Sequence, residues 1–203
     1  MPTHGPVLRH PSTGAADGSG TIMGQHEDTI TTAAARLRQL GTDMTALRRP
    51  TGDTTRTPTR VHAPAPLDLG ILDHMVAARN EVIGHTRAHQ PNAEPAPADE
   101  NIYAWMDANT AHLDDAKRRA GRALVVRQSM EHALLAGDET VVRREPCPRC
   151  ACWGLSWQPG PRHAVCLNRR CSAPEGGPST WTLAQLAHHH TTRIETINAQ
   201  SAT

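Results

Sequence analysis

The chain has 203 residues and a formal net charge of +1, and hydrophobic residues make up 37% of it, whereas aromatic residues make up 2% and phenylalanine is missing. This composition excludes one large conventional hydrophobic core and favours small ordered parts joined by flexible stretches rich in proline and glycine. The near-zero charge excludes a field that would draw the whole chain onto nucleic acid or an anionic membrane, so any such attraction has to be local.

The first residues show no basic stretch followed by an apolar run, and no segment approaches the roughly 20 apolar residues that a membrane-spanning helix needs. We therefore expect a soluble, cytoplasmic protein with no membrane partner. A reducing compartment also suits the five cysteines, because four of them are grouped like metal ligands rather than like a disulfide framework.

The N-terminal part of the chain changes character twice. Residues 1–27 are rich in Gly, Ser, Thr, Pro and His without apolar periodicity, which predicts a disordered tail. From residue 28 to about 47, apolar residues recur at steps of three and four, which predicts an amphipathic helix that Gly41 interrupts or weakens. Residues 48–66 then predict a linker, because four prolines stand among Thr and Arg.

Two further helical segments follow. Apolar residues predict a second helix from residue 67 to about 88, and a third helical region from residue 99 to about 134 with a bend near Asn109 and an end at Gly137. We interpret these stripes as a small helical core, with a coiled coil or a partner-binding surface as the alternative. The paired Asp114 and Asp115 are interpreted as charges at a helix N-terminus rather than as a catalytic acid and base.

Four cysteines near the C-terminus are spaced as C-x2-C and, after fifteen residues, C-x4-C; they are Cys147, Cys150, Cys166 and Cys171. The short turn between two cysteines points both sulfurs the same way, and a second pair completes a tetrahedron, so the spacing predicts a Zn²⁺ site in a zinc ribbon. Four thiolates also suit iron. Cys152 and His163 are available as alternative ligands, although the paired spacing needs neither.

The segment between the two cysteine pairs has the pattern of a strand. Trp153, Leu155 and Trp157 alternate with smaller or polar residues, as in a strand with one apolar face. We expect both tryptophans to pack over the hairpin beside the metal; stacking on nucleic-acid bases is the alternative.

A turn at Pro159-Gly160-Pro161 would return the chain as a second strand. If this turn centres on Gly160, Trp157 faces His163 and Leu155 faces Val165.

A last apolar stripe from Leu183 to Ile197 predicts a helix that packs on the ribbon, with Ser179 or Thr180 as its N-terminal cap. The three successive histidines 188–190 on this helix cannot all face one metal. The sequence therefore predicts a mostly α protein with a small β part. Its organisation is a tail at 1–27, a helical region with Pro-rich linkers at 28–140, and a zinc ribbon with a C-terminal helix at 141–198.

Four arginines stand beside or between the cysteines: Arg149, Arg162, Arg169 and Arg170. A zinc ion held by four thiolates carries net negative charge, so these side chains either compensate that charge or remain solvated. They are also the best candidates in the chain for contacts to nucleic-acid phosphates.

One enzyme class was weighed because Pro146 to Cys150 matches the P-C-x-x-C half of a zinc-dependent nucleobase deaminase. That reaction also requires an H-x-E motif, and the chain contains none. The second cysteine pair moreover fills the coordination positions that a catalytic zinc leaves open for water. We therefore expect no enzymatic activity.

The segment CPRCACWGLSWQPGPRHAVCLNRRC, followed by STWTLAQLAHHH, resembles uncharacterised small zinc-ribbon proteins of actinobacteria and their phages. The resemblance covers residues 141 to about 194 and, more loosely, the helices from Leu67 onward. It implies a zinc ribbon in a phage or mobile-element setting and no assigned reaction. Ala151 departs from the common C-P-x-C-G knuckle, where glycine stands, which places the local turn in question.

The sequence thus predicts a non-catalytic zinc-ribbon binding protein that contacts nucleic acid through the arginines of the ribbon. The alternative is a structural zinc module in a protein that binds a protein partner or another copy of itself.

Overall fold

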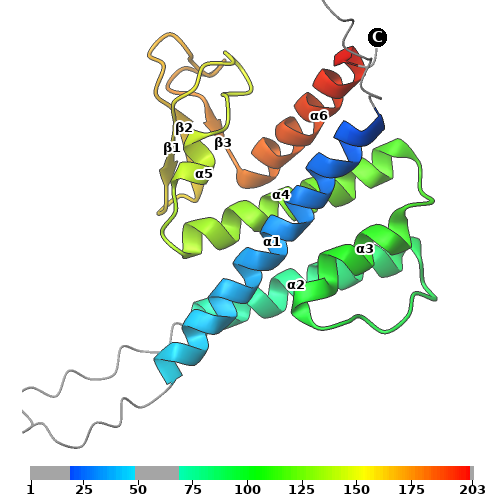
Figure 1. The fold of residues 1–203 in the computed structure, drawn as a ribbon. Helices are drawn as coiled ribbons and strands as arrows, with labels where there is room; N and C mark the ends of the chain where they lie inside the picture. The colour runs from blue at the N-terminus through cyan, green and yellow to red at the C-terminus, as the bar shows by residue number, and fades with distance from the viewer. Residues whose placement is uncertain (1–18, 49–68, 202–203) are drawn as a thin grey trace, which may run out of the picture.

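The computed structural model describes residues 19–48 and 69–201, which form helices and one small antiparallel sheet (Figure 1). The expectation of a mostly α protein with a small β part is confirmed. The elements in chain order are α1 (Ser19–Arg48), α2 (Leu69–His89), the short 3-10 helix η1 (Asp99–Asn101), α3 (Ile102–Thr110), α4 (Asp115–Leu135), α5 (Thr140–Arg143), β1 (Leu155–Gln158), β2 (His163–Cys166), β3 (Thr180–Trp181) and α6 (Leu183–Ser201).

Helix α1 is longer than the sequence predicts. It begins at Ser19, so residues 19–27 are helical and the predicted tail at 1–27 is too long by these residues. The helix also continues through Gly41, so the predicted interruption does not occur. A Cβ atom at Gly41 would lie 3.4 Å from the end of the Met75 side chain in α2, which is an ordinary contact distance. Residues 1–18 and the predicted linker after Arg48 lie outside the described residues.

Helix α2 matches its predicted range but not the whole predicted apolar face. Its buried residues include Ala78, Val82 and Thr86. Val76, one of the apolar residues of the predicted helix, is 51% exposed. The buried Thr86 hydroxyl donates to the Val82 carbonyl at 2.9 Å, which satisfies it within the helix. The buried face is therefore formed by small and β-branched side chains.

The predicted bend near Asn109 is a true break between two helices. Helix α3 ends at Thr110, and α4 begins after Asp114, whose carboxylate accepts the Lys117 backbone N–H at 2.9 Å as an N-terminal cap. This confirms the interpretation of Asp114 as a helix-terminal charge. At the other end Gly137 has a φ of +81°, and the Asp138 N–H donates to the Ala133 carbonyl, which ends α4 where predicted.

Helix α4 lies between two hydrophobic cores and contributes residues to both. Val125 faces a core formed with α1, α2 and α3, which contains Leu37, Val82 and Met106. The next residue, Val126, faces a second core formed with the sheet and α6. Figure 1 shows α4 behind α1, with the sheet and α6 on one side of it and α2 and α3 on the other. The predicted helical core is confirmed, and the ribbon segment shares its own core with α4.

A buried polar chain crosses the helical core. The Tyr103 hydroxyl donates to the Gln128 side-chain oxygen at 2.9 Å, and the Gln128 amide donates to the Ala78 carbonyl at 3.0 Å. Tyr103 and Gln128 are both fully buried. These bonds satisfy groups that would otherwise destabilise the core, and they link α3, α4 and α2.

The hairpin of β1 and β2 forms as predicted but with a register one residue different. Trp157 pairs with Ala164 and Leu155 pairs with Cys166, so the predicted pairs with His163 and Val165 are wrong. The loop contains four residues, and its last one, Arg162, has a φ of +55°. The left-handed Arg162 places one more residue in the loop than a turn centred on Gly160 would, which shifts every pair.

The segment before α6 differs from the prediction as well. Thr180 and Trp181 form β3, which pairs with β2, so Thr180 is not the helix cap. Thr182 caps α6 instead: its hydroxyl accepts the Gln185 N–H at 3.2 Å, and the Gln185 side chain accepts the Thr182 N–H at 2.9 Å. This reciprocal pair is a capping box. The predicted packing of α6 is confirmed, because Leu183, Leu186 and Ala187 are in the second core.

Candidate metal centre

The four cysteines of the predicted set come together at one end of the sheet. Their sulfur atoms all lie within 4.8 Å of one another, and Cys147 and Cys171 are 3.7 Å apart while Cys150 and Cys166 are 3.8 Å apart. A metal–sulfur bond of about 2.3 Å in a tetrahedron places its sulfurs about 3.8 Å apart. A disulfide would require about 2.0 Å. The four thiols are therefore arranged as a possible metal site and not as disulfides.

The first cysteine pair is held by a knuckle, which we define as residues 147–152. The Ala151 N–H donates to the Cys147 carbonyl at 2.8 Å, and the Cys147 N–H donates to the Cys152 carbonyl at 3.0 Å. These two bonds close a tight loop that directs the sulfurs of Cys147 and Cys150 to the same side. To close it, Ala151 adopts a φ of +55°, which is the conformation that glycine provides in the common knuckle.

Replacing Ala151 by glycine is expected to stabilise the folded protein by up to about 1 kcal/mol, because alanine in the left-handed region is strained and glycine is not. The gain would appear as a higher urea midpoint of the metal-loaded protein. Ala173→Gly is the matched control, because Ala173 lies in a neighbouring loop without a positive φ. Equal destabilisation by both substitutions would contradict the assigned strain.

The second pair is held by another knuckle, residues 166–171. Cys166 ends β2, and the Cys171 N–H donates to the Asn168 carbonyl at 2.8 Å. The Asn168 side-chain oxygen accepts the Arg170 N–H at 3.0 Å, so Asn168 closes this turn from both its backbone and its side chain.

Two residues that the sequence analysis does not assign to the metal site contact the sulfurs. The Asn168 side-chain amide donates to the Cys150 sulfur at 3.7 Å and to the Cys152 sulfur at 3.5 Å. The buried Ser179 hydroxyl lies 3.4 Å from the Cys171 sulfur. The Ser179 hydroxyl donates to the Cys171 carbonyl, whereas an amide donor such as that of Asn168 orients ligands and offsets thiolate charge. The position of Asn168 between two ligands in a short turn is the signal that could have identified it.

Hydrogen bonding and burial shift the pKa values of two of the thiols in opposite directions. A hydrogen bond from the Cys152 backbone lowers the pKa of the Cys150 thiol to about 6, which favours its thiolate form. Burial raises the pKa of the Cys166 thiol to about 12. Ionisation of Cys166 at neutral pH therefore depends on a cation at the centre of the cluster, as expected for residues that bind metal as thiolates.

The two alternative ligands lie outside the cluster. Cys152 is exposed and is not among the four sulfurs that lie within mutual ligating distance. His163 begins β2, at the end of the strand opposite Cys166. The pairwise spacing was therefore the correct guide to which thiols come together.

The cluster is also part of the second hydrophobic core. Cys147, Cys166 and Cys171 are buried and pack in the same core as Met130 of α4 and Leu186 of α6. Metal bound here would tie the sheet to two helices.

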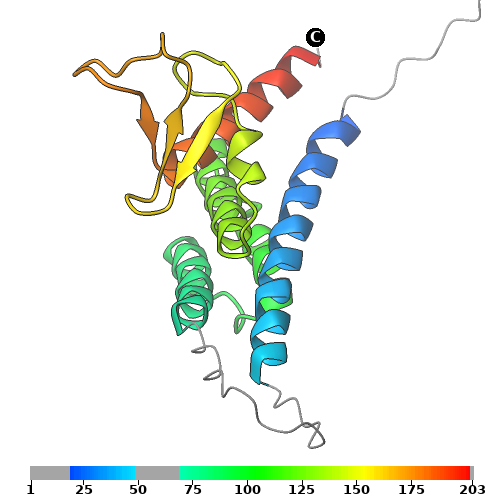
Figure 2. The same cartoon turned by 90° about the vertical axis from the view of Figure 1, so that its left-hand side faces the viewer.

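The four arginines do not form one surface. Arg149, Arg169 and Arg170 lie on the two knuckles, and all three are exposed. Arg162 lies at the hairpin turn, which points toward α2, away from the cysteine-bearing loops (Figure 2). Burial lowers the pKa of His74 in α2, and the nearby charge of Arg162 lowers it further, against the opposing effect of Glu131. The structure thus separates Arg162 from the other three.

Within the described residues, no carboxylate forms an ion pair with Arg149, Arg169 or Arg170. The Arg149 guanidinium donates to the Ser172 carbonyl at 3.1 Å, a bond that leaves its charge uncompensated. The only carboxylate in the sequence between residues 147 and 178 is Glu175. The knuckles therefore present unpaired positive charge.

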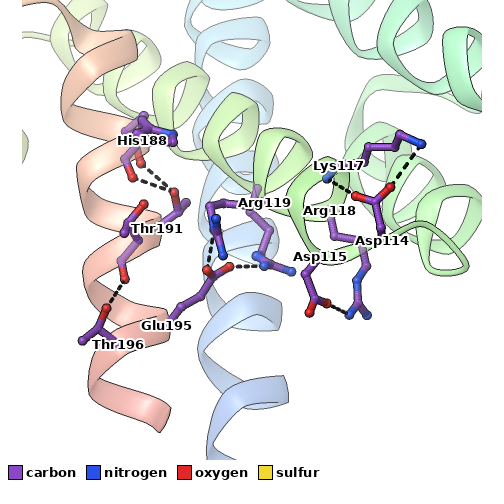
Figure 3. A network of polar contacts seen from close by, with 12 residues as sticks. Asp114, Asp115, Lys117, Arg118, Arg119, His188, Thr191, Glu195 and Thr196 are labelled. Atoms are coloured by element: carbon purple, nitrogen blue, oxygen red, sulfur yellow. Dashed lines mark hydrogen bonds and ion pairs between the residues drawn. The ribbon is translucent and has the colours of Figure 1, made fainter. Parts of the chain in front are cut away.

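The basic segment at the start of α4 shows the opposite arrangement. Lys117 pairs with Asp114, and Arg118 pairs with Asp115 (Figure 3). Glu195 of α6 accepts from Arg119, as Figure 3 shows, and also from Arg122. Each of these positive charges has a carboxylate partner, and the pairs of Arg119 and Arg122 with Glu195 join α4 to α6.

The two tryptophans of the predicted hairpin differ in exposure. Trp157 is partly buried and packs against the second core, as expected. Trp153 is 66% exposed, so the prediction that it packs beside the metal is wrong. Gly154, with a φ of +125°, breaks the regular alternation of side chains between these two residues. Leu167, whose N–H donates to the Gly154 carbonyl, is 64% exposed as well.

No helix in the ranges 19–48 and 69–201 is long and apolar enough to cross a membrane. Comparison of the chain with known protein families, with curated proteins and with solved structures finds no match. The geometry and charge of the cysteine centre and its knuckles are therefore the features that bear on function.

Proposed function

We propose that the protein is a non-catalytic zinc-ribbon binding protein, and that its knuckles contact the phosphates of nucleic acid. The observation that carries the proposal is that Arg149, Arg169 and Arg170 on the two knuckles have no carboxylate partner among the described residues, whereas the basic segment at the start of α4 is paired with carboxylates. Arginine forms short, charge-assisted bonds with phosphate oxygens, and such contacts release counterions from the polymer.

Zinc fits this donor set, because four thiolates in tetrahedral spacing form a closed structural site. A closed set leaves no coordination position for a substrate or an activated water, which supports a role without catalysis. When bound, zinc would supply the ionisation of the buried thiols and the rigidity of the knuckles. The proposal includes a cytoplasmic location, where thiols stay reduced, and the phage or mobile-element setting that the sequence resemblance implies.

The positions of the arginines also indicate which of them to expect in contact with phosphates. Arg149 bridges the knuckles through the Ser172 carbonyl, while Arg169 and Arg170 stand directly before the ligand Cys171. Their positions are therefore fixed by the same turns that hold the sulfurs. Arg162 belongs to the original set of candidates, but its place at the hairpin turn gives it at most a minor part in this surface.

The double substitution Arg169→Ala/Arg170→Ala is expected to weaken binding to mixed-sequence DNA and RNA and to flatten its salt dependence. Loss of two phosphate contacts lowers the slope of log affinity against log salt by about 1.8 on a duplex and about 1.4 on a single strand. Fluorescence anisotropy across a salt series on the zinc-loaded protein measures both effects.

The matched control is Lys117→Ala/Arg118→Ala, which removes two positive charges that are already paired. This variant should retain the slope of the parent protein. An unchanged slope in the Arg169→Ala/Arg170→Ala variant would refute the proposed surface. A complex that is insensitive to salt, or a molecular mass that rises with concentration, would instead favour the alternative of a structural zinc module that binds a protein partner or another copy of the chain.

A further inference from the structure

Trp153 is the most exposed of the large hydrophobic side chains that the structure describes, at 66%, and Leu167 is next at 64%. The other tryptophans, Trp105, Trp157 and Trp181, are partly buried and pack against one of the two cores. In a chain with so few aromatic residues, an indole left in water does not contribute to either core. Its exposure needs a different explanation.

Hydrogen bonds hold the backbone that carries this indole on both sides. Trp153 forms an isolated β-bridge with Pro146 on one side, and the next residue, Gly154, accepts the Leu167 N–H at 3.0 Å on the other. Both contacts lie beside metal ligands, Cys147 and Cys166 respectively. A side chain mounted on such a braced backbone loses little conformational entropy when it binds a partner.

Three exposed arginines lie on the same two knuckles as the exposed pair. Arg149 and Trp153 belong to or directly follow the first knuckle, and Leu167, Arg169 and Arg170 belong to the second. The two knuckles are joined by the sulfur cluster and by the bond from Arg149 to the Ser172 carbonyl. We call this set of five residues the knuckle surface. It combines a flat aromatic group with three cations that lack carboxylate partners.

The residues of the knuckle surface indicate which class of partner it can bind. A stable protein interface buries about 800 Å² on each side around an apolar centre, and two apolar side chains among three arginines do not provide one. In duplex DNA the base faces are already stacked on each other. A single strand offers unstacked bases beside phosphates, which matches an indole beside arginines.

We propose that the knuckle surface binds single-stranded nucleic acid, with a base stacked on Trp153 and the adjacent phosphates held by Arg149, Arg169 and Arg170. This inference rests on the proposed function and narrows it to a class of substrate. Stacking uses a face that every base possesses, so binding would tolerate changes of sequence. Leu167 extends the apolar contact next to the indole.

The test compares a labelled oligothymidylate and a labelled oligouridylate with a blunt duplex, using the full-length zinc-loaded protein and fluorescence anisotropy. Trp153→Ala is expected to weaken single-strand binding roughly 5- to 100-fold and to leave duplex binding nearly unchanged. Trp153→Phe should recover much of the loss, because an aromatic face is restored. Val76→Ala is the matched control, because it shortens another exposed hydrophobic side chain, on α2, and it should have no effect.

Because Trp153 is exposed, its variants should keep the metal content and circular dichroism of the parent protein, which verifies that any loss is not unfolding. Unchanged single-strand affinity in Trp153→Ala, together with a flattened salt slope in Arg169→Ala/Arg170→Ala, would overturn stacking and leave the proposed function intact. Binding to the duplex alone would also overturn the single-strand proposal and leave the proposed function intact. Absence of binding to all three probes would overturn both proposals.

Discussion

Cys147→Ser is expected to abolish metal binding and to unfold the sheet together with the packing of α6. Cys147 is 1% exposed, and it lies in the core that also holds Met130 and Leu186. Structural zinc contributes on the order of 10 kcal/mol of apparent binding free energy that is coupled to folding, which exceeds what this small core supplies by itself. Removal of the metal by a chelator should have the same result.

Metal content and hydrogen exchange measured on the same sample test this expectation. Exchange should accelerate in the sheet, in α6 and in the half of α4 that faces them, and less in α3, which packs in the other core. Cys152→Ser is the matched control, because it removes an exposed thiol outside the cluster and should keep one metal per chain. Normal folding of Cys147→Ser without metal would contradict the stabilising role of the site.

Acid is expected to destabilise the protein through a buried histidine. His132 of α4 is fully buried, its ring contacts that of His74 edge-on with the centroids 5.2 Å apart, and its nitrogens have no hydrogen-bond partner of good geometry. Burial, together with smaller contributions from the nearby His74 and Arg36, lowers the pKa of His132 to about 4. The folded protein therefore holds this imidazole neutral.

The direction follows from proton linkage. The unfolded chain takes up a proton at this position near pH 6.5, whereas the folded protein takes it up only near pH 4. The contribution of the neutral imidazole to stability is therefore fully present above pH 6.5. It is lost as the pH falls from 6.5 to 4, and the loss of folding free energy reaches about 3 kcal/mol near pH 4. Urea unfolding measured at intervals between pH 7 and pH 4 records the loss.

His132→Leu should reduce this acid sensitivity, because leucine has a similar volume and no proton to bind. Release of metal from protonated thiolates also destabilises the protein in acid, but it affects both proteins alike, so the difference between their two curves isolates the histidine. His112→Leu is the control, because His112 is exposed. Parallel pH curves for His132→Leu and the parent protein would show that His132 does not carry the effect.

Local sequence signals determined the helices and the membership of the metal site. The period of apolar residues identified α2, α3 and α4, because burial of one helical face imposes that period. Asp114 and Gly137 marked the ends of α4, because capping depends on neighbouring residues in the chain. The spacing of the four cysteines identified the cluster for the same reason: a short knuckle brings two sulfurs together whatever surrounds it.

Local sequence signals did not determine the register of the hairpin. Whether the loop contained three or four residues depended on the left-handed backbone of Arg162, which the residue type does not favour. The similar conformation of Ala151 preserved the knuckle in spite of the missing glycine. In both places contacts of the surrounding fold hold the backbone in a conformation that local preference opposes.

By itself, the sequence determined the positions of α2, α3, α4 and α6 and which four thiols can share a metal, because these properties depend on neighbours along the chain. Only the tertiary structure decided that Trp157 packs and Trp153 does not, that Arg162 stands apart from Arg149, and that Arg119 and Arg122 of α4 are paired with Glu195 of α6. These outcomes depend on contacts between segments distant in sequence. Exposure and charge pairing, on which the proposed function rests, are fixed only when those segments pack.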